Sequence, residues 1–545
     1  MANAGINCRV ATRAALVALV AVSLSPAAVP VAAVEPVPRL LDLRVGNGST
    51  PFAGDGRLLT TVSPNGDGFR DRAIVSFRLD GDATIELDVL QTLNVKRGRS
   101  NVHTIWSARY AFRRGRHRLA WTPERTIANG TYVLELTVSD ALGRRRIYND
   151  FPVGGHVRVS APVVRIQRVE VSLGPRYTPG QTARVSIATD ARHLDLDVLS
   201  FRNGSGTQDA KTTARPMAPP VALAWRGHRD APGSVRIRIG DWPSGLYFVR
   251  ITSRGHRVGY APFIVRPRSL GTSRIAVVLP TNTWQAYNFA DADGDGWGDS
   301  WYVNGARRTI DIRRPYLDAG VPWRFRDFDA AIIGWLSSRG NLDFLSDLDL
   351  AHIADGDVLA RHYDLIVFPG HEEYVTTHEY DLVRRYRDLG GNLMFLSANN
   401  LFWKVVFHGR KMRRLAEWRN LGRPEAGVVG VQYVASNYGA QQGPYVADTG
   451  GAPWAFAGTG LAAGDRFGRY GYEIDMRSPA SPPGTVLLAS IPDLMGPGRT
   501  AEMTYYENAR GAKVFAGGAL NFAASIDQPA VARLLDNIWT RLSHP

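Results

Sequence analysis

The fold is decided by three short apolar runs, which are SRIAVVLP (Ser273–Pro280), DLIVFPG (Asp364–Gly370) and NLMFLSAN (Asn392–Asn399). Each run has the length and the β-branched or aromatic content of a buried strand. Two segments between them, DAAIIGWLSSRG (Asp329–Gly340) and TTHEYDLVRRYRDLG (Thr376–Gly390), have helical patterns that end at glycine. Strands that alternate with helices predict a parallel sheet of flavodoxin-like, amidotransferase-like α/β type for residues 272–545.

The first half of the chain has a different pattern. Short alternating runs such as AIVSFRLD (73–80) and TIELDVLQ (84–91) are separated by turns rich in Gly, Asp and Asn, which is typical of antiparallel β-sandwiches. We therefore expect two all-β immunoglobulin-like sandwiches, over residues 40–155 and 162–266, ahead of the α/β domain.

The N-terminus indicates export. Two basic residues, Arg9 and Arg13, precede an apolar run that ends near Leu24, and small residues suit cleavage after Ala33, so residues 1–33 are predicted to be a signal peptide. The run is shorter than a membrane-spanning helix. We expect a mature protein that is secreted or held at the cell surface, with no membrane span.

Composition narrows the chemistry. Cys8 is the only cysteine of the 545 residues and would leave with the signal peptide, so the mature chain has no thiol nucleophile or disulfide. The net charge of +15 comes mostly from arginines spread along every segment. They do not form the basic stripe with aromatic residues that binds nucleic acid, so no nucleic-acid partner is expected.

Polar residues follow each of the three apolar runs. TNTWQAYN (281–288) follows the first, HEEY (371–374) the second and NNLFW (399–403) the third. In open α/β sheets ligands bind beyond the carboxyl ends of the strands, so these segments should meet in one site. Without a thiol or a G-x-S-x-G motif, the side chains that remain are carboxylate, phenol, imidazole and amide, and such oxygen ligands suit a hard cation.

Two resemblances follow from longer motifs. SPNGDGFRD (63–71) and NGTYVLELTVSDALGRRR (129–146) resemble the FlgD-like immunoglobulin-like modules of bacterial surface proteins. Eight ordered blocks resemble the C-terminal region of the N,N-dimethylformamidase large (β) subunit family, from about Val163 onward: DWPSGLYFVRI, VLPTNTWQAYN, RRPY, GHEEY, GGNLMFLSANNLFW, GRPE, FAGTGLAAGDR and GYEID.

The second resemblance implies an iron-dependent hydrolase of a small non-peptide amide. It implies a ferric iron held by Tyr247, Tyr287 and Glu373, with His371 orienting substrate or water, Asn399 holding the amide and Glu473 as general base. Tyr374 is an alternative phenolate to Tyr287, and Glu507 an alternative base to Glu473. Tyr247 also fits a packed core tyrosine, because a Gly-x-Tyr step commonly opens a late strand of a sandwich.

The segment DADGDGWGDS (291–300) is a departure from the family. Four aspartates fall at the first, third, fifth and ninth positions of a calcium-loop pattern, with Gly296 at the turn; they are Asp291, Asp293, Asp295 and Asp299. Position twelve is Tyr302 rather than glutamate. A calcium site and a solvated acidic turn are both consistent with this pattern.

Two other functions stay open. The chain is alternatively a non-catalytic surface, adhesion or glycan-binding protein on the same scaffold, and an association with the cell envelope is a further alternative. A weaker alternative is a glycoside-acting enzyme that pairs Glu372 or Glu373 with Glu473. The sequence leaves the substrate, a homo-oligomer and a small partner subunit undecided.

Overall fold

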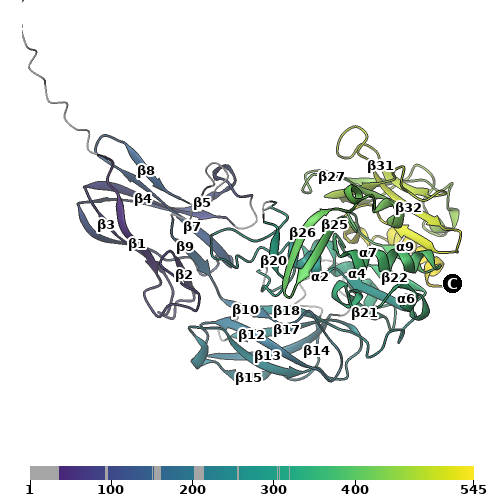
Figure 1. The fold of residues 1–545 in the computed structure, drawn as a ribbon, viewed down its shortest axis with the longest axis horizontal. Coiled ribbons are helices and arrows are strands. Elements are labelled where there is room, and N and C mark those ends of the chain that lie inside the picture. The colour runs from purple at the N-terminus through teal and green to yellow at the C-terminus, as the bar shows by residue number, and fades with distance from the viewer. Residues whose placement is uncertain are drawn as a thin grey trace, which may run out of the picture.

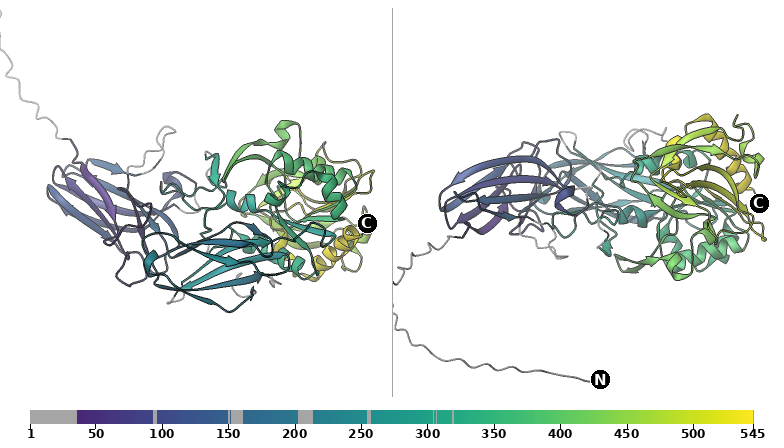
Figure 2. Two further views of the ribbon diagram at one scale, coloured as in Figure 1. Left: turned by 60° about the horizontal axis from the view of Figure 1, so that its bottom comes forward. Right: turned by 90° about the horizontal axis from the view of Figure 1, so that it is seen from above.

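The computed structural model describes residues 36–92, 96–149, 151, 161–201, 214–253, 257–303, 305, 307–317 and 320–544. Its three units follow one another along the long axis (Figure 1). Seen from two other sides, the N-terminal unit stays at one end and the C-terminal unit at the other (Figure 2). The predicted signal peptide, residues 1–33, lies outside the described residues.

The first unit consists of two sheets that enclose one apolar core. One sheet has the strand order β1-β3-β6 and the other β2-β9-β7-β4-β5, with β8 beside β7. Their bounds are β1 Leu40–Gly46, β2 Leu59–Val62, β3 Ala73–Leu79, β4 Ala83–Gln91, β5 His103–Phe112, β6 Gly115–Trp121, β7 Gly130–Ser139, β8 Arg145–Tyr148 and β9 Val163–Ile166. The strict alternation of buried and half-buried residues along β3 and β4 shows one face toward this core.

The second unit also has two sheets, ordered β10-β12-β16 and β11-β18-β17-β13-β14, with β15 beside β13. The bounds are β10 Val169–Ser172, β11 Arg176–Tyr177, β12 Thr182–Thr189, β13 His193–Phe201, β14 Ala214–Pro216, β15 Val221–Ala224, β16 Gly233–Arg238, β17 Gly245–Ser253 and β18 Val258–Val265. Strand β17 is buried on both faces. Tyr247 and Val249 pack in the core of this unit, whereas Leu246 and Phe248 pack against the third unit.

The third unit is built on a nine-stranded sheet, ordered β21-β19-β22-β24-β33-β32-β31-β28-β29. Its bounds are β19 Ile275–Leu279, β21 Asp343–Ser346, β22 Leu365–Phe368, β24 Asn392–Phe395, β28 Gln442–Ala447, β29 Arg466–Gly471, β31 Val486–Ile491, β32 Ala501–Glu507 and β33 Lys513–Ala516. The first five strands in this order are parallel and the others antiparallel.

Two smaller sheets accompany it, ordered β20-β26-β25-β23 and β27-β30. Their bounds are β20 Thr309–Asp311, β23 Tyr374–Val375, β25 Trp403–His408, β26 Lys411–Glu417, β27 Gln432–Ser436 and β30 Glu473–Met476. The helices are α2 Thr281–Ala286, α3 Phe325–Phe328, α4 Ala330–Ser337, α5 Asp347–Leu350, α6 Gly356–His362, α7 Thr377–Asp388, α8 Ala426–Val429 and α9 Pro529–Ser543. Side chains of α4 and α9 pack on one face of the nine-stranded sheet, and those of α6 and α7 on the other.

The predicted fold class is wrong. Strands make up 40% of the structure and helices 16%, and the large sheet is mixed rather than parallel. The chain is therefore a β-rich multidomain protein without the predicted flavodoxin-like parallel domain. The three apolar runs do form the adjacent parallel strands β19, β22 and β24. The error arose beyond Asn399, where the chain adds antiparallel strands to the same sheet.

Among the described residues, no helix has both the length and the apolar composition needed to cross a membrane.

Candidate active site

Five of the six residues predicted for the site meet at the carboxyl edge of the parallel strands. Tyr287 donates a hydrogen bond from its hydroxyl to Glu373 Oε2 at 2.5 Å. The His371 Nε2 atom lies 3.7 Å from Glu373 Oε2 and 3.4 Å from Glu473 Oε2. Asn399 Nδ2 donates to the same Glu473 oxygen at 2.8 Å. All five side chains are buried.

The loop that carries His371 and Glu373 is fixed by its neighbours on both sides. The Glu373 amide donates to Thr283 Oγ1 at 3.1 Å, and the Glu373 carbonyl accepts the Trp403 amide at 2.8 Å. Asn282 Nδ2 donates to the Tyr374 carbonyl at 3.1 Å. These bonds join the segments after β19, β22 and β24 into one rim, as the polar sequence after each strand predicted.

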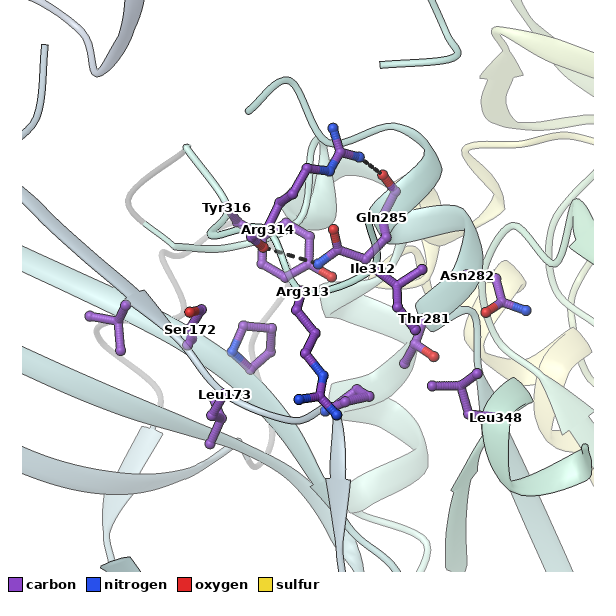
Figure 3. Close-up of a pocket in the computed structure, with 14 residues that line it drawn as sticks. Ser172, Leu173, Thr281, Asn282, Gln285, Ile312, Arg313, Arg314, Tyr316 and Leu348 are labelled. Atoms are coloured by element: carbon purple, nitrogen blue, oxygen red, sulfur yellow. Dashed lines mark hydrogen bonds between the residues drawn. The ribbon is translucent and has the colours of Figure 1, made fainter. Parts of the chain in front are cut away.

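A buried arginine positions Tyr287. Tyr287 caps the C-terminal end of the short helix α2, where backbone carbonyls lack partners within the helix. Arg314 donates to the carbonyls of Gln285, Asn288 and Ala290. Figure 3 shows the Arg314 side chain against Gln285, beside a cavity of about 30 Å³ between this turn and the second unit. Burial lowers the pKa of Arg314 to about 10, so it stays charged at neutral pH.

Asn399 is held in an uncommon backbone conformation. Its φ is 54°, in the left-handed region that side chains other than glycine rarely adopt. Its amide donates to both carboxylate oxygens of buried Asp475, at 2.8 and 3.0 Å. Asp475 was not predicted, although it follows Glu473 by two residues in GYEID and therefore shares its face of the strand.

The site is rich in acidic groups and poor in cations. Burial, followed by the charge of Glu473, raises the pKa of the Glu373 carboxyl well above its usual value. Burial, followed by the charge of Glu373, does the same to the phenols of Tyr287 and Tyr374. Arg414 is the basic group that acts on Glu373 in the opposite direction. Such a set of oxygens has the chemistry of a cation site.

The pKa values of Glu473 and His371 leave each side chain in a useful protonation state at neutral pH. Burial raises the pKa of Glu473 to about 7, the value at which a general base works best near neutrality. Burial lowers the pKa of His371 to about 3, so this imidazole is neutral. Neither of its ring nitrogens has a hydrogen-bond partner among the described residues, and Asn399 Oδ1 has none either. These atoms are placed to bind a small polar molecule.

Tyr247 is the predicted site residue that does not lie at the rim. Its hydroxyl donates to the Pro243 carbonyl at 2.7 Å, and its ring stacks on Trp242 and Phe263. The pocket it lines also includes Thr272 and Asp343, which lie at the amino ends of β19 and β21, opposite the rim. Because Leu246 and Phe248 pack in the core shared with the third unit, the alternation of β17 places the Tyr247 ring in the core of the second unit. The core tyrosine is the interpretation that fits.

The two alternative residues, Tyr374 and Glu507, lie in different places. Tyr374 pairs with Trp403 in β23 and β25, and its phenol interacts with the Glu373 carboxyl. Its ring centroid lies 6.1 Å from that of Tyr287. Glu507 instead pairs with Arg541 at 2.7 Å and is partly exposed. The rim therefore holds two phenols, Tyr287 and Tyr374, and Glu473 is the base candidate in it.

The acidic loop lies outside the rim. Asp291, Asp293 and Asp295 offer oxygens within 4.8 Å of one another, whereas Asp299 pairs with Arg307 at 2.7 Å. Burial, followed by the charge of Asp295, raises the pKa of Asp291 to about 8. The calcium assignment stays a prediction for all four aspartates, since arginines pair with Asp293, Asp295 and Asp299 alike.

The same loop joins the first unit to the third. Arg97 pairs with Asp295 at 2.9 Å, and its guanidinium lies 5.4 Å from the Trp297 ring centroid. A Cβ built on Gly296 would lie 2.7 Å from Val133 of β7, so the loop packs closely on the first unit. The segment that departs from the family is therefore a contact surface between units.

Comparison with known proteins identifies the family of the chain. The sequence profile of the N,N-dimethylformamidase beta subunit-like C-terminal family matches residues 201–533. The chain belongs to this family. The matched range covers the rim and leaves out the first unit, so the FlgD-like resemblance stays a prediction.

Individual relatives are distant. The N,N-dimethylformamidase beta subunit of Paracoccus aminophilus is 26% identical over 330 residues, which cover 47% of this chain and 42% of the relative. That of an Alcaligenes species is 26% identical over 44% of this chain and 39% of the relative. This chain thus spans less than half of their length. Among solved structures, the mmIFT52 N-terminal domain is 14% identical over 39% of this chain and 88% of its own, with a TM-score of 0.25.

Proposed function

We propose that this protein is an iron-dependent hydrolase of a small non-peptide amide. The observation that carries the proposal is the convergence of Tyr287, Tyr374, Glu373 and Glu473 with His371 and Asn399 in one buried, cation-poor rim. Membership of the dimethylformamidase family supports the amide as substrate class. Three further points of the proposal rest on the sequence alone: that the metal is iron, that the protein is exported, and that a partner subunit exists.

The residues present fit an iron ion. Tyr287, Tyr374 and Glu373 supply two phenol oxygens and one carboxylate, which are hard donors that suit a ferric ion. Together they replace the predicted set, with Tyr374 in the place of Tyr247. When bound, the metal would supply Lewis-acid polarisation of the amide carbonyl and stabilise the charge that develops on its oxygen.

The other side chains would bind substrate and move a proton. Asn399 Oδ1 and the neutral His371 ring, which have no partners among the described residues, would orient the amide and a water molecule. Glu473 would take a proton from this water as it attacks the carbonyl carbon, and would then protonate the departing amine. The hydrogen bond from Asn399 Nδ2 holds the Glu473 carboxylate in place.

The first test is metal analysis and amide turnover of the purified full chain after expression with added iron. We expect about one iron atom per chain, as a single site of this kind would bind, and release of amine from N-methylformamide or a larger formamide. Less than about one tenth of an equivalent would contradict the iron site. Full iron occupancy without hydrolysis of any small amide would contradict the reaction.

Export and calcium are tested separately. N-terminal sequencing of protein from the culture medium should find a chain that begins near Val34, after the predicted cleavage site. The midpoint temperature of thermal unfolding of the full chain should rise with added calcium if Asp291, Asp293 and Asp295 bind the ion. A ligand that binds only the native state stabilises that state. An unchanged transition would leave these aspartates as an acidic turn.

A further inference from the structure

A line of aromatic side chains leads from the rim to the surface. The ring centroid of Tyr287 lies 5.2 Å from that of Tyr302, which lies 4.4 Å from Trp323 and 5.4 Å from Tyr438. Exposure grows along the line, from 7% at Tyr287 to 53% at Tyr438, with Tyr302 and Trp323 between them. A continuous series of ring contacts thus joins the polar, acidic site to an exposed tyrosine.

The outer end of this line is held in a costly backbone conformation. Tyr438 and Tyr472 have φ values of 56° and 66°, in the left-handed region that is unfavourable for bulky side chains. A Cβ on Gly439 would lie 2.4 Å from the Tyr472 ring, so this turn is packed onto the residue that precedes Glu473. Strained residues of this kind gather at ligand-binding sites. An exposed tyrosine held in this way is a placed group rather than a loose one.

Two cations border the same rings. The Lys96 ammonium lies 5.1 Å from the ring centroid of Tyr438. The Arg324 guanidinium lies 4.9 Å from the Tyr472 ring, and it pairs with Asp327 at 3.0 Å. Lys96 is exposed, and no carboxylate lies within ion-pair distance of it among the residues that the structure describes. Arg324 thus has both a carboxylate and aromatic rings as partners, whereas the partner of Lys96 among the described residues is the Tyr438 ring.

Lys96 comes from the first unit, in the segment between β4 and β5. Tyr438 comes from the third unit, next to β27. The acidic loop that packs on the first unit fixes this meeting, since Arg97 pairs with its Asp295. A unit that the family profile does not cover thus supplies a cation beside the exposed end of the ring series.

We propose that this border is a subsite for the distal part of the substrate, which is an amide with a planar apolar group that ends in a carboxylate. The planar group would pack against Tyr302, Trp323 and Tyr438, and the carboxylate would pair with Lys96. The inference rests on the proposed function, because it names the substrate class of the same site. Aromatic rings bind planar groups by offset or edge contacts, and the Lys96 ammonium, which lies over the Tyr438 ring, is close enough to pair with an anion at the end of such a group.

The test compares two formamides that differ in one charge, N-benzylformamide and 4-(formamidomethyl)benzoate. In the wild-type protein the carboxylate should have the lower KM. Lys96→Met keeps the length of the side chain and removes its charge, and it should shrink that preference about fivefold, as an exposed ion pair is lost. Lys411→Met is the matched control, since Lys411 is another exposed lysine, paired weakly with Asp311 at 3.6 Å, and it should keep the wild-type preference.

A second variant tests the rings. Tyr438→Ala should raise the KM of both benzyl compounds more than that of N-methylformamide, which has no ring to pack. Tyr110→Ala, at an exposed tyrosine of β5, is its control. Equal KM values for the two benzyl compounds in the wild type, or a preference that survives Lys96→Met, would overturn the proposal.

Failure of the reaction and failure of the subsite are distinguishable. If no formamide is hydrolysed, the proposed function fails, and binding of the benzoate is then measured by calorimetry on the same proteins. Tighter binding to the wild type than to Lys96→Met, weakened by salt, supports the subsite. Equal binding to both proteins, or no binding, overturns it.

Discussion

Two buried tyrosines were both predicted to bind iron. One lies in the core of the second unit, and the other lies at the carboxyl edge of the sheet in the third unit. Tyr247 is 1% exposed and Tyr287 is 7% exposed, so burial does not distinguish them. The partner of the hydroxyl does. Tyr247 bonds a backbone carbonyl among aromatic rings, whereas Tyr287 bonds a carboxylate beside a second carboxylate and an imidazole. For these two tyrosines, the partner of the hydroxyl therefore separates the phenol at the rim from the phenol in the core.

The largest effect should come from Glu373→Gln. This change removes the carboxylate that joins Tyr287 to the rim, so bound iron and turnover should both be lost. Glu372→Gln is the matched control, because the electrostatic partners of Glu372 are Asp347 and Glu379 rather than Tyr287, Tyr374 or Glu473, and it should keep its iron. Metal analysis and amine release measure both. Iron retained by Glu373→Gln would contradict the role of the Glu373 carboxylate as an iron ligand.

Glu473→Gln should slow turnover and spare the metal. Glutamine still accepts the hydrogen bond from Asn399 but cannot take a proton, and loss of a general base costs about 10²- to 10⁴-fold in kcat. The KM should change little. Steady-state kinetics with iron content as a control separate the two roles, and a fall in iron together with kcat would assign Glu473 to the metal instead.

Tyr247→Phe should have the smallest effect. It removes one hydrogen bond to a backbone carbonyl, which costs about 1 kcal/mol in the free energy of unfolding. Iron content and kcat should stay at the wild-type values. Urea unfolding and metal analysis of the same preparation check this, and a protein without iron would restore Tyr247 to the site.

Much of the rim could be predicted, because each of its segments directly follows a strand that is recognisable in the sequence. Parallel strands end at the same edge of a sheet, so the polar residues after SRIAVVLP, DLIVFPG and NLMFLSA had to be neighbours. The residue types at positions 287, 371, 373, 399 and 473 then limited the chemistry. The antiparallel half of the sheet was missed because its strands give weaker patterns and pair over long sequence distances.

Other errors have a physical cause as well. A two-residue period decides which way Tyr247 faces, and the sequence does not reveal which face of β17 meets the third unit, since both faces are apolar. Arg314 lies in the RRPY block and Tyr302 at the end of the calcium-loop pattern, but neither motif indicates a role at the rim, because their roles arise from contacts with the turn that follows α2. Such contacts between distant segments appear only in the folded chain.

The most direct measurement is the iron content of four proteins prepared alike: the wild type, Tyr287→Phe, Tyr374→Phe and Tyr247→Phe. The visible absorption of phenolate bound to ferric iron is recorded on the same samples. We predict about one iron atom per chain and the absorption band in the wild type and in Tyr247→Phe, and loss or strong weakening of both in Tyr287→Phe and Tyr374→Phe. Iron that survives in Tyr287→Phe, or that disappears in Tyr247→Phe, would contradict the site described at the carboxyl edge of the sheet.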